Sequence, residues 1–334
     1  MIPAPLFSAQ NLVKHFRLKG GFLGSSRGVV RAVDNVSFDL AEGETLGIVG
    51  ESGCGKSTTA RLIVDLISPD AGTITLGGKL LGKHISAREL RRQIQMVFQD
   101  SYASLNPRLT MEDAIAFGPK VNGMSPQQAA RLAHELLERV GLEPRRFAGR
   151  YPHELSGGQR QRVNIARALA FSPKIIVLDE SVSALDKSVE AQVLNLLADL
   201  KAELGLTYVF ISHDLNVVRH MSDRVMVMYL GQVAEIGTVE AIYSAPAHPY
   251  TAALLSAMPS MDPDRRTMEP PLTGDPPNPI NPPAGCRFHT RCKLADTICG
   301  AVEPGLFGLP GEGHQVACHI HIPGSNHRNR RVEA

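Results

Sequence analysis

Short apolar runs, bounded by Gly, Pro, Ser or charged residues, recur along the first part of the chain and predict β-strands. They lie at 36–40 (VSFDL), 45–50 (TLGIVG), 72–77 (GTITLG) and 94–99 (IQMVFQ). The segment 56–67 instead has helical spacing and stops before a Ser-Pro pair, so we predict a helix there.

The pattern becomes mostly helical between about residues 101 and 170. Runs at 127–140 and 159–170 have helical spacing and are separated by Pro and Gly. Strands return at 174–180 (KIIVLDE) and 207–212 (TYVFIS), and the apolar runs on either side of Gly231 predict a hairpin. This order of elements predicts an α/β core with an inserted helical subdomain.

A change in composition near Pro259 marks the end of that core. Proline is dense from there to Pro283, which disfavours both helix and sheet. Beyond it lie four of the five cysteines, Cys286, Cys292, Cys299 and Cys318. We therefore divide the chain into a main domain at 1–258 and a proline-rich linker with a Cys-containing extension at 259–334.

The charge and the aromatic content of the chain limit the kinds of partner that it is expected to bind. The 334 residues are 43% hydrophobic, enough for a full core, but the net charge is only +2 and aromatic residues make up 5% with no Trp. Such a chain offers neither a basic surface nor stacking platforms, so nucleic acid is not an expected partner. No apolar run approaches the roughly 20 residues that span a bilayer, and the N-terminus lacks a signal-peptide layout, so we expect a cytoplasmic protein.

The segment Gly50 to Ser57 (GESGCGKS) fits the phosphate-loop pattern and lies between a predicted strand and a predicted helix. Its glycines can turn backbone amides inward around phosphate oxygens at a helix N-terminus. Lys56 would add a charge to the β and γ phosphates and Ser57 a hydroxyl to Mg²⁺. The predicted ATP contacts are Gly50, Ser52, Gly53, Cys54, Gly55, Lys56, Ser57 and Thr58, with Cys54 a small filler without a redox role.

The apolar run at 174–180 ends in two acids. Asp179 ends the strand, so its carboxylate should emerge at the carboxyl edge of the sheet and hold Mg²⁺. Side chains alternate along a strand, so Glu180 turns away from Asp179, where it could polarise an attacking water. Two solvated acids that cap the next helix are the alternative reading of this segment alone.

A second anion cradle is predicted where LSGGQ opens a helix, because a Ser-Gly-Gly turn there leaves amides and a hydroxyl free. One chain thus carries two cradles, separated by helical sequence. The simplest arrangement assigns them to different ATP molecules that are shared across a dimer. The second cradle consists of Leu155, Ser156, Gly157, Gly158 and Gln159.

These three motifs, in this order, resemble the ATP-binding cassette (ABC) family of ATPases. The resemblance implies a P-loop nucleotide-binding domain with a RecA-like core, an antiparallel β-subdomain and a helical subdomain inserted at about 101–170. It also implies that two cassettes pair head to tail, so that each LSGGQ segment closes on the ATP held by the other cassette's phosphate loop.

Smaller family markers add candidate residues. By resemblance, Gln99 reaches toward Mg²⁺ and the water, His213 contacts the γ-phosphate, and Asp186 belongs to the D-loop. Phe16 matches the aromatic residue that stacks on adenine, although a core role is the alternative. The chain departs from the family at Ser181, where a Pro is usual, but both preceding acids are intact.

The C-terminal third, with AHPYT at 247–251 and PPLTGDPPNPINPPAGCRFHTRC, resembles the tail of the ATPase subunits of bacterial dipeptide, oligopeptide and nickel importers. The implied function is ATP-driven import of di- and oligopeptides by a peripheral protein at the cytoplasmic face of the inner membrane. The implied partners are two membrane permease subunits, a second, non-identical ABC ATPase and an extracytoplasmic solute-binding protein.

Other functions stay open at this point. The same machine could import nickel, an opine or a sugar conjugate, because the ATPase does not touch the cargo. A soluble cassette protein that acts on ribosomes or DNA would be expected to carry two cassettes, a coiled-coil insert or a basic surface. A phosphate-loop kinase would have no use for LSGGQ.

The cysteine spacing lacks the close Cys-x2-Cys pair of structural zinc sites, and a cytosolic chain argues against disulfides. Four thiolates without a close pair suit an iron-sulfur cluster better. By resemblance to family members with the same pattern, a 4Fe-4S cluster is expected on Cys286, Cys292, Cys299 and Cys318. Zinc or free thiols in a proline-pinned tail remain the alternatives.

Overall fold

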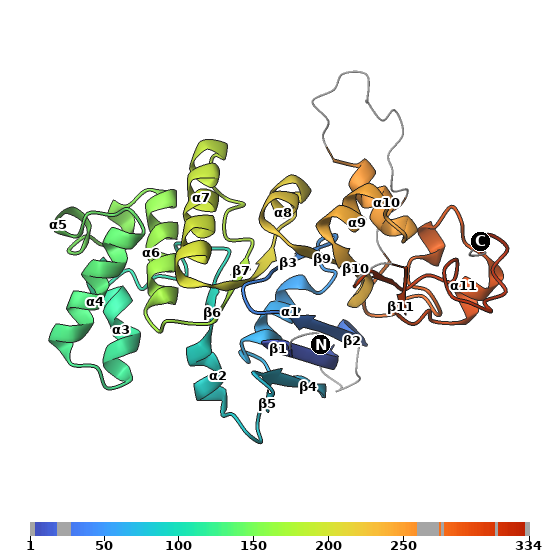
Figure 1. Ribbon diagram of the computed structural model, residues 1–334, viewed down its shortest axis with the longest axis horizontal. Helices are drawn as coiled ribbons and strands as arrows, with labels where there is room; N and C mark the ends of the chain where they lie inside the picture. The colour runs from blue at the N-terminus through green and yellow to red at the C-terminus, as the bar shows by residue number, and fades with distance from the viewer. Residues whose placement is uncertain (1–3, 19–27, 259–273, 275–276, 311–312, 331–334) are drawn as a thin grey trace, which may run out of the picture.

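The computed structural model describes residues 4–18, 28–258, 274, 277–310 and 313–330. Most of the predicted proline-rich linker, including residues 259–273, lies outside these ranges. Two sheets and a lateral group of helices make up the described chain (Figure 1). No helix in the described ranges is long and apolar enough to cross a membrane.

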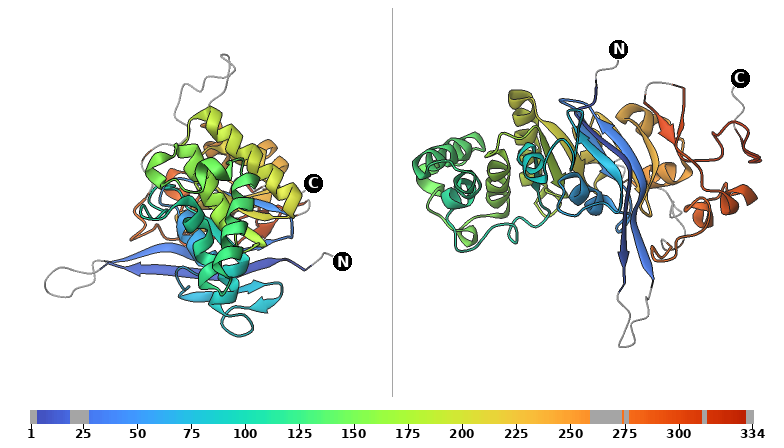
Figure 2. Two further views of the ribbon diagram at one scale, coloured as in Figure 1. Left: turned by 90° about the vertical axis from the view of Figure 1, so that its left-hand side faces the viewer. Right: turned by 90° about the horizontal axis from the view of Figure 1, so that it is seen from below.

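The smaller sheet is antiparallel, as expected for the β-subdomain, with the strand order β2-β1-β4-β5. Its two long strands lie side by side across one side of the molecule (Figure 2). Its bounds are β1 Phe7–Arg17, β2 Val29–Leu40, β4 Ala71–Leu76 and β5 Lys79–Leu80.

The larger sheet has the order β11-β12-β10-β9-β3-β8-β7-β6 and is parallel from β6 to β9. Every residue of β3, β7 and β8 is buried, which explains why these strands read as continuous apolar runs. The hairpin about Gly231 is confirmed as β9 and β10. The bounds are β3 Thr45–Val49, β6 Ile94–Val97, β7 Ile175–Asp179, β8 Thr207–Ile211, β9 Arg224–Tyr229 and β10 Gln232–Thr238.

Helix α1 (Lys56–Ile63) follows β3 and leads to the smaller sheet, whereas α7 (Lys187–Leu204) and α8 (Leu215–Met221) connect parallel strands. The prediction that the first of these runs to Ile67 is wrong. Helix α1 ends at Ile63 because Asp65 has a positive φ of 52°, which turns the chain out of the helix.

The inserted helices form the lateral group at the left of Figure 1. Thr110, Ser125 and Ser156 each begin a helix by accepting a hydrogen bond from the backbone amide three residues on. The bounds are α3 Met111–Val121, α4 Pro126–Arg139, α5 Pro144–Phe147 and α6 Gly157–Leu169, with a 3-10 turn η1 at Pro152–Glu154. Helix α2 (Ala87–Gln93) precedes β6.

The C-terminal extension packs on the free edge of the larger sheet, where β12 pairs with β10. Such two-residue strands in a sequence rich in Pro and Gly carry no pattern that predicts them. Helices α9 (Val239–Ser244) and α10 (Pro249–Ser256) end the main domain, and the elements of the extension are η3 His289–Arg291, α11 Thr297–Ala301, β11 Phe307–Gly308 and β12 Gln315–Val316.

A buried carboxylate anchors this docking. Glu235 of β10 is 0% exposed and accepts hydrogen bonds from the amides of Ala247 (2.7 Å) and His248 (3.0 Å). Nε2 of His314 lies 2.7 Å from the same carboxylate. Burial, the largest single influence, would raise the pKa of Glu235, but these hydrogen bonds outweigh it and lower the pKa.

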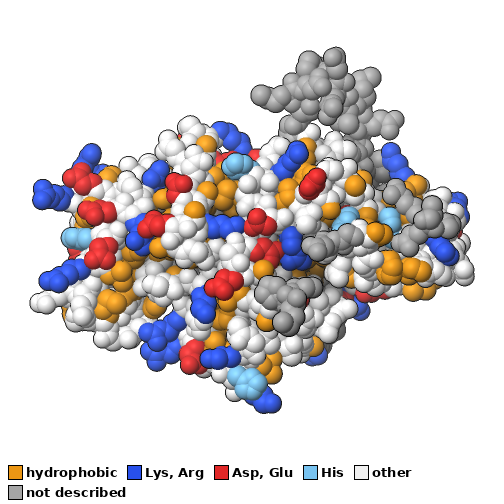
Figure 3. Space-filling view, viewed as in Figure 1, with side chains coloured by type: hydrophobic (Ala, Val, Ile, Leu, Met, Phe, Trp, Pro, Cys, Tyr) orange, Lys and Arg blue, Asp and Glu red, His pale blue; other side chains and the backbone are white. Residues whose placement is uncertain are grey.

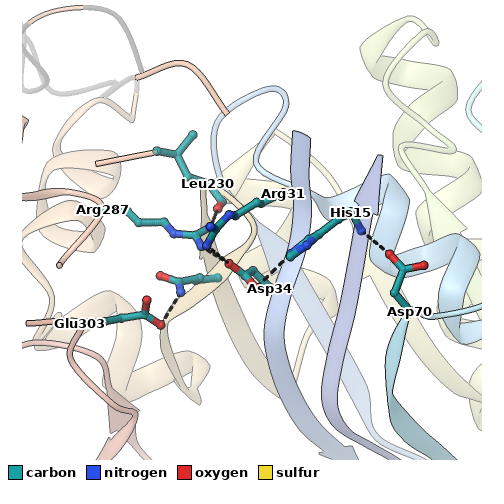
Figure 4. A network of polar contacts seen from close by, with 8 residues as sticks. His15, Arg31, Asp34, Asp70, Leu230, Arg287 and Glu303 are labelled. Atoms are coloured by element: carbon teal, nitrogen blue, oxygen red, sulfur yellow. Dashed lines mark hydrogen bonds and ion pairs between the residues drawn. The ribbon is translucent and has the colours of Figure 1, made fainter. Parts of the chain in front are cut away.

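A second polar network joins the extension to the smaller sheet (Figure 4). Arg287 donates to the Asp34 carboxylate and to the carbonyl of Leu230. His15 Nε2 lies 3.1 Å from the other carboxylate oxygen of Asp34. Elsewhere charges are interspersed, and the face in Figure 3 shows acidic and basic side chains side by side.

Candidate nucleotide-binding and hydrolysis site

The predicted phosphate loop connects β3 to α1. Helix α1 has Gly55 as its N-cap, with no side-chain cap hydrogen bond, so the amides of its first turn are available to an anion. Lys56 is buried, and its Nζ donates to the carbonyls of Gly50 (2.8 Å) and Glu51 (3.0 Å) inside the loop. The ammonium group is therefore already held at the mouth of the loop.

Close backbone contacts explain two of the glycines. A Cβ on Gly55, whose φ is 109°, would lie 2.2 Å from the carbonyl oxygen of Ala32. A Cβ on Gly50, at φ 146°, would lie 2.2 Å from the carbonyl oxygen of Met228. The loop is thus wedged between β2 and β9, and only glycine fits at these two positions.

Asp179, the last residue of β7, and Glu180, the next residue, have different partners. Ser57 Oγ donates to Asp179 Oδ1 at 3.0 Å, which brings together the two predicted Mg²⁺ ligands. Burial is the main cause of the raised pKa of Asp179. Glu180 has a positive φ of 45°, rare for a residue with a side chain, and its amide donates to Ile211 on β8.

Residues from two loops converge on one oxygen of Glu180. Gln99, just after β6, donates from Nε2 to Glu180 Oε2 at 3.0 Å. His213, just after β8, places Nδ1 3.6 Å from the same oxygen, and its side chain is 63% exposed. All three lie at the carboxyl end of the parallel strands, where α/β sheets bind ligands.

The LSGGQ segment opens α6 with a capping box. Ser156 Oγ accepts from the amide of Gln159, and Gln159 Oε1 accepts from the amide of Ser156 at 3.0 Å. A Cβ on Gly158 would lie 2.3 Å from Val189 Cγ1, so a glycine is needed where α6 meets α7. Asp186, the predicted D-loop residue, is exposed at the N-cap of α7.

Phe16 lies near the end of β1 with 41% of its surface exposed, so it does not belong to the core. Lys14 Nζ lies 5.8 Å from the centre of its ring. An exposed ring in this position is free to stack on a planar ligand.

Two family models match the chain. The model described as "ABC transporter" covers residues 33–183, and that described as "Oligopeptide/dipeptide transporter, C-terminal region" covers residues 234–299. A probable peptide ABC transporter ATP-binding protein of Sinorhizobium fredii is 50% identical over 95% of this chain and 90% of its own length. The oligopeptide transport ATP-binding protein AppF of Bacillus subtilis is 48% identical over 95% of this chain and 97% of its own.

The chain belongs to the ABC transporter ATP-binding family. Among solved structures, the ATP-binding cassette MJ0796, in a dimeric post-hydrolysis state bound to ADP and Pi, is similar with a TM-score of 0.61 and 33% identity. The similarity covers 70% of this chain and 98% of that one. CbiO1 from Clostridium perfringens, part of an ABC transporter complex, has a TM-score of 0.60 and 28% identity over 72% of this chain and 91% of its own. The ABC cassette fold predicted from the motifs is confirmed.

A groove of about 370 Å³ opens on this ABC cassette between the helical insert and β6. Its lining is mainly apolar, and Phe117 on α3 is 60% exposed at its wall. Phe98 lines the groove and immediately precedes Gln99, so the groove adjoins the loop that reaches Glu180.

The four extension cysteines lie near one another. Cys286 donates its amide to the carbonyl of Cys299 at 2.7 Å. Burial raises the pKa of Cys286 to about 11 and that of Cys318 to about 12, and the neighbouring thiols add to both effects. Across the described ranges, however, no group of three or more His, Cys, Asp or Glu is arranged to hold a metal ion. The expected 4Fe-4S cluster is therefore not confirmed.

The motifs did not reveal one group of residues that touches the ABC phosphate loop. Arg291, from the extension, pairs with Glu51, the second residue of the loop. Tyr250 on α10 accepts a hydrogen bond from the Glu51 amide at 2.9 Å. The signal in the sequence was only that RFHTRC carries an arginine beside a cysteine, which does not indicate its partner.

The contacts of the loop glycines predict unequal effects of alanine. Gly55→Ala should abolish ATP binding and lower the free energy of unfolding by about 3 kcal/mol, because the new methyl group overlaps the Ala32 carbonyl and the positive φ disfavours a side chain. Gly53→Ala, where a Cβ meets open space, should cost only about 1 kcal/mol. Urea unfolding and nucleotide titration measure both effects, and equal losses in the two variants would contradict this account of the loop.

Proposed function

We propose that this chain is the ATP-hydrolysing subunit of an importer of di- and oligopeptides. The observation that carries the proposal is the presence, in one chain, of the phosphate loop and Glu180 group together with the region matched at 234–299. The names of the relatives, which match almost the whole chain, favour peptides over nickel, opines or sugar conjugates.

The chain works as a dimer of cassettes in which each LSGGQ segment completes the ATP site of the other. Support comes from the two anion cradles on different elements, α1 and α6, and from the dimeric state of the related cassette MJ0796. Ser156 and the amides of Gly157 and Gly158 then face the triphosphate bound to the other cassette.

Within each site, Glu180 is the general base. Gln99 and His213 hold its carboxylate toward the position of the attacking water, and Lys56 and the loop amides bind the phosphates. The Ser57 hydroxyl and the Asp179 carboxylate, with Gln99, would hold Mg²⁺, which neutralises the phosphate charge when it is bound. Phe16 stacks on the adenine.

The membrane partners dock in the groove beside Phe117. It lies between the helical insert and the Gln99 loop, so a segment seated there is coupled to the residue that holds Glu180. We propose two permease subunits, a second, non-identical ABC ATPase and an extracytoplasmic solute-binding protein as the rest of the importer. We propose that the chain is a peripheral subunit at the cytoplasmic face of the membrane. We also propose that the main domain ends near residue 258, where the proline-rich linker begins.

Glu180→Gln should bind ATP with nearly unchanged affinity but lose ATP turnover by at least about a hundredfold, because the amide cannot take the proton of the attacking water. The variant should accumulate as a dimer with ATP, which size-exclusion chromatography with light scattering measures. Glu240→Gln, an exposed acid on α9, is the matched control. Undiminished turnover in Glu180→Gln would remove Glu180 as the base.

We also propose that Cys286, Cys292, Cys299 and Cys318 hold a 4Fe-4S cluster. Four thiols in one small unit are the donor set that such clusters use. After burial, the neighbouring thiols are among the causes that raise the pKa of Cys286 and of Cys318. The cluster would tie η3, α11 and β12 into one body.

Protein purified without oxygen should contain about four iron and four sulfide per chain. Cys299→Ser should lose most of this iron, whereas Cys54→Ser, which changes the phosphate-loop cysteine, should keep it. Metal and sulfide analysis with visible absorption spectra measures the result. One zinc per chain, or no metal at all, would contradict the cluster.

A further inference from the structure

An arginine of the extension forms an ion pair with a residue of the phosphate loop. Arg291, at the end of η3, donates from Nη1 to Glu51 Oε2 at 2.7 Å and from Nη2 to Glu51 Oε1 at 3.0 Å. The Arg291 side chain is only 6% exposed and that of Glu51 is 22% exposed. This bidentate, largely buried ion pair fixes the orientation of the Glu51 carboxylate and compensates its negative charge.

Two tyrosines also contact this ion pair, one through Arg291 and one through the Glu51 backbone. Arg291 Nη1 also donates to the hydroxyl of Tyr229 at 3.2 Å, and the amide of Glu51 donates to the hydroxyl of Tyr250 at 2.9 Å. The rings of Tyr229 and Tyr250 lie 4.6 Å apart, so they pack on each other. Glu51 is therefore fixed through its side chain and through its backbone.

Glu51 is in turn connected to the residues that bind phosphate. Its carbonyl accepts from Lys56 Nζ at 3.0 Å and from the amide of Cys54 at 3.2 Å. The loop therefore carries, beside the groups proposed to bind the triphosphate, a residue with a negatively charged carboxylate. Without a compensating cation, that carboxylate would repel the nucleotide.

We propose that Arg291 is a positioning residue for ATP: it neutralises and holds Glu51, so that the docked C-terminal extension sets the ATP affinity of the cassette. The inference rests on the proposed ATP site and is independent of the cargo and of the cysteine group. It gives the extension a role in the ATPase cycle.

The test measures the Kd of MgATP by titration calorimetry on the full chain. Arg291→Gln should weaken binding by about tenfold, the size of a typical coupling between two sites. Glu51→Gln, which removes the repelling charge, should bind within about threefold of the original chain, and Glu51→Gln/Arg291→Gln should match Glu51→Gln. Arg291→Lys keeps the charge and should lose less than Arg291→Gln. At saturating ATP, the kcat of Arg291→Gln should be unchanged.

Arg287→Gln is the control, because Arg287 also joins the extension to the cassette but contacts Asp34 and Leu230 rather than the phosphate loop. It should leave the Kd of MgATP unchanged while it lowers the Tm. The proposal is overturned if Arg291→Gln binds MgATP like the original chain, or if the Arg291 effect persists in the Glu51→Gln background. If Arg291→Gln does not fold, the Arg291→Lys and double variants decide by the same criteria. Lys56→Ala distinguishes a failure of the Arg291 proposal from a failure of the proposed ATP site. MgATP binding that persists in Lys56→Ala would overturn the proposed ATP site itself.

Discussion

The phosphate loop must bring backbone amides to one point without side chains in the way, and the surrounding structure meets this constraint. Gly55 lies against the carbonyl of Ala32 on β2, and Gly50 lies against that of Met228 on β9. The loop is therefore shaped by both sheets, and its position depends on how they pack. The buried parallel strands β3, β7 and β8 then bring Asp179 and Glu180 to the same edge.

This arrangement explains how one carboxylate can respond to several parts of the molecule. Glu180 takes its position from a strained backbone at the end of β7, while Gln99 and His213 reach its oxygen from the loops after β6 and β8. The Gln99 loop adjoins the groove beside Phe117. A partner seated in that groove would therefore lie beside the loop whose Gln99 donates a hydrogen bond to Glu180.

The parts of the fold that could be predicted are those with a strong periodic signal. The buried strands and the hairpin about Gly231 follow from runs of apolar residues, and the inserted helices α4 and α6 follow from helical spacing between Pro and Gly. The end of α1 was missed because the backbone turn at Asp65 has no distinctive residue type. The phosphate loop and the acids after β7 could be found because their chemistry requires adjacent residues. The Arg291–Glu51 pair could not, because 240 positions separate its members and only the packing of the extension brings them together.

The central claim is that this cassette drives peptide import with energy from ATP bound at its own phosphate loop. The most direct measurement is the uptake of labelled di- and oligopeptides in the native cell, with the original chain compared with Lys56→Ala. That substitution removes the charge that binds phosphate and leaves the buried strands intact. We predict that peptide uptake collapses in Lys56→Ala. Peptide uptake that persists, while uptake of nickel or another solute fails, would contradict the assignment of peptides as the cargo.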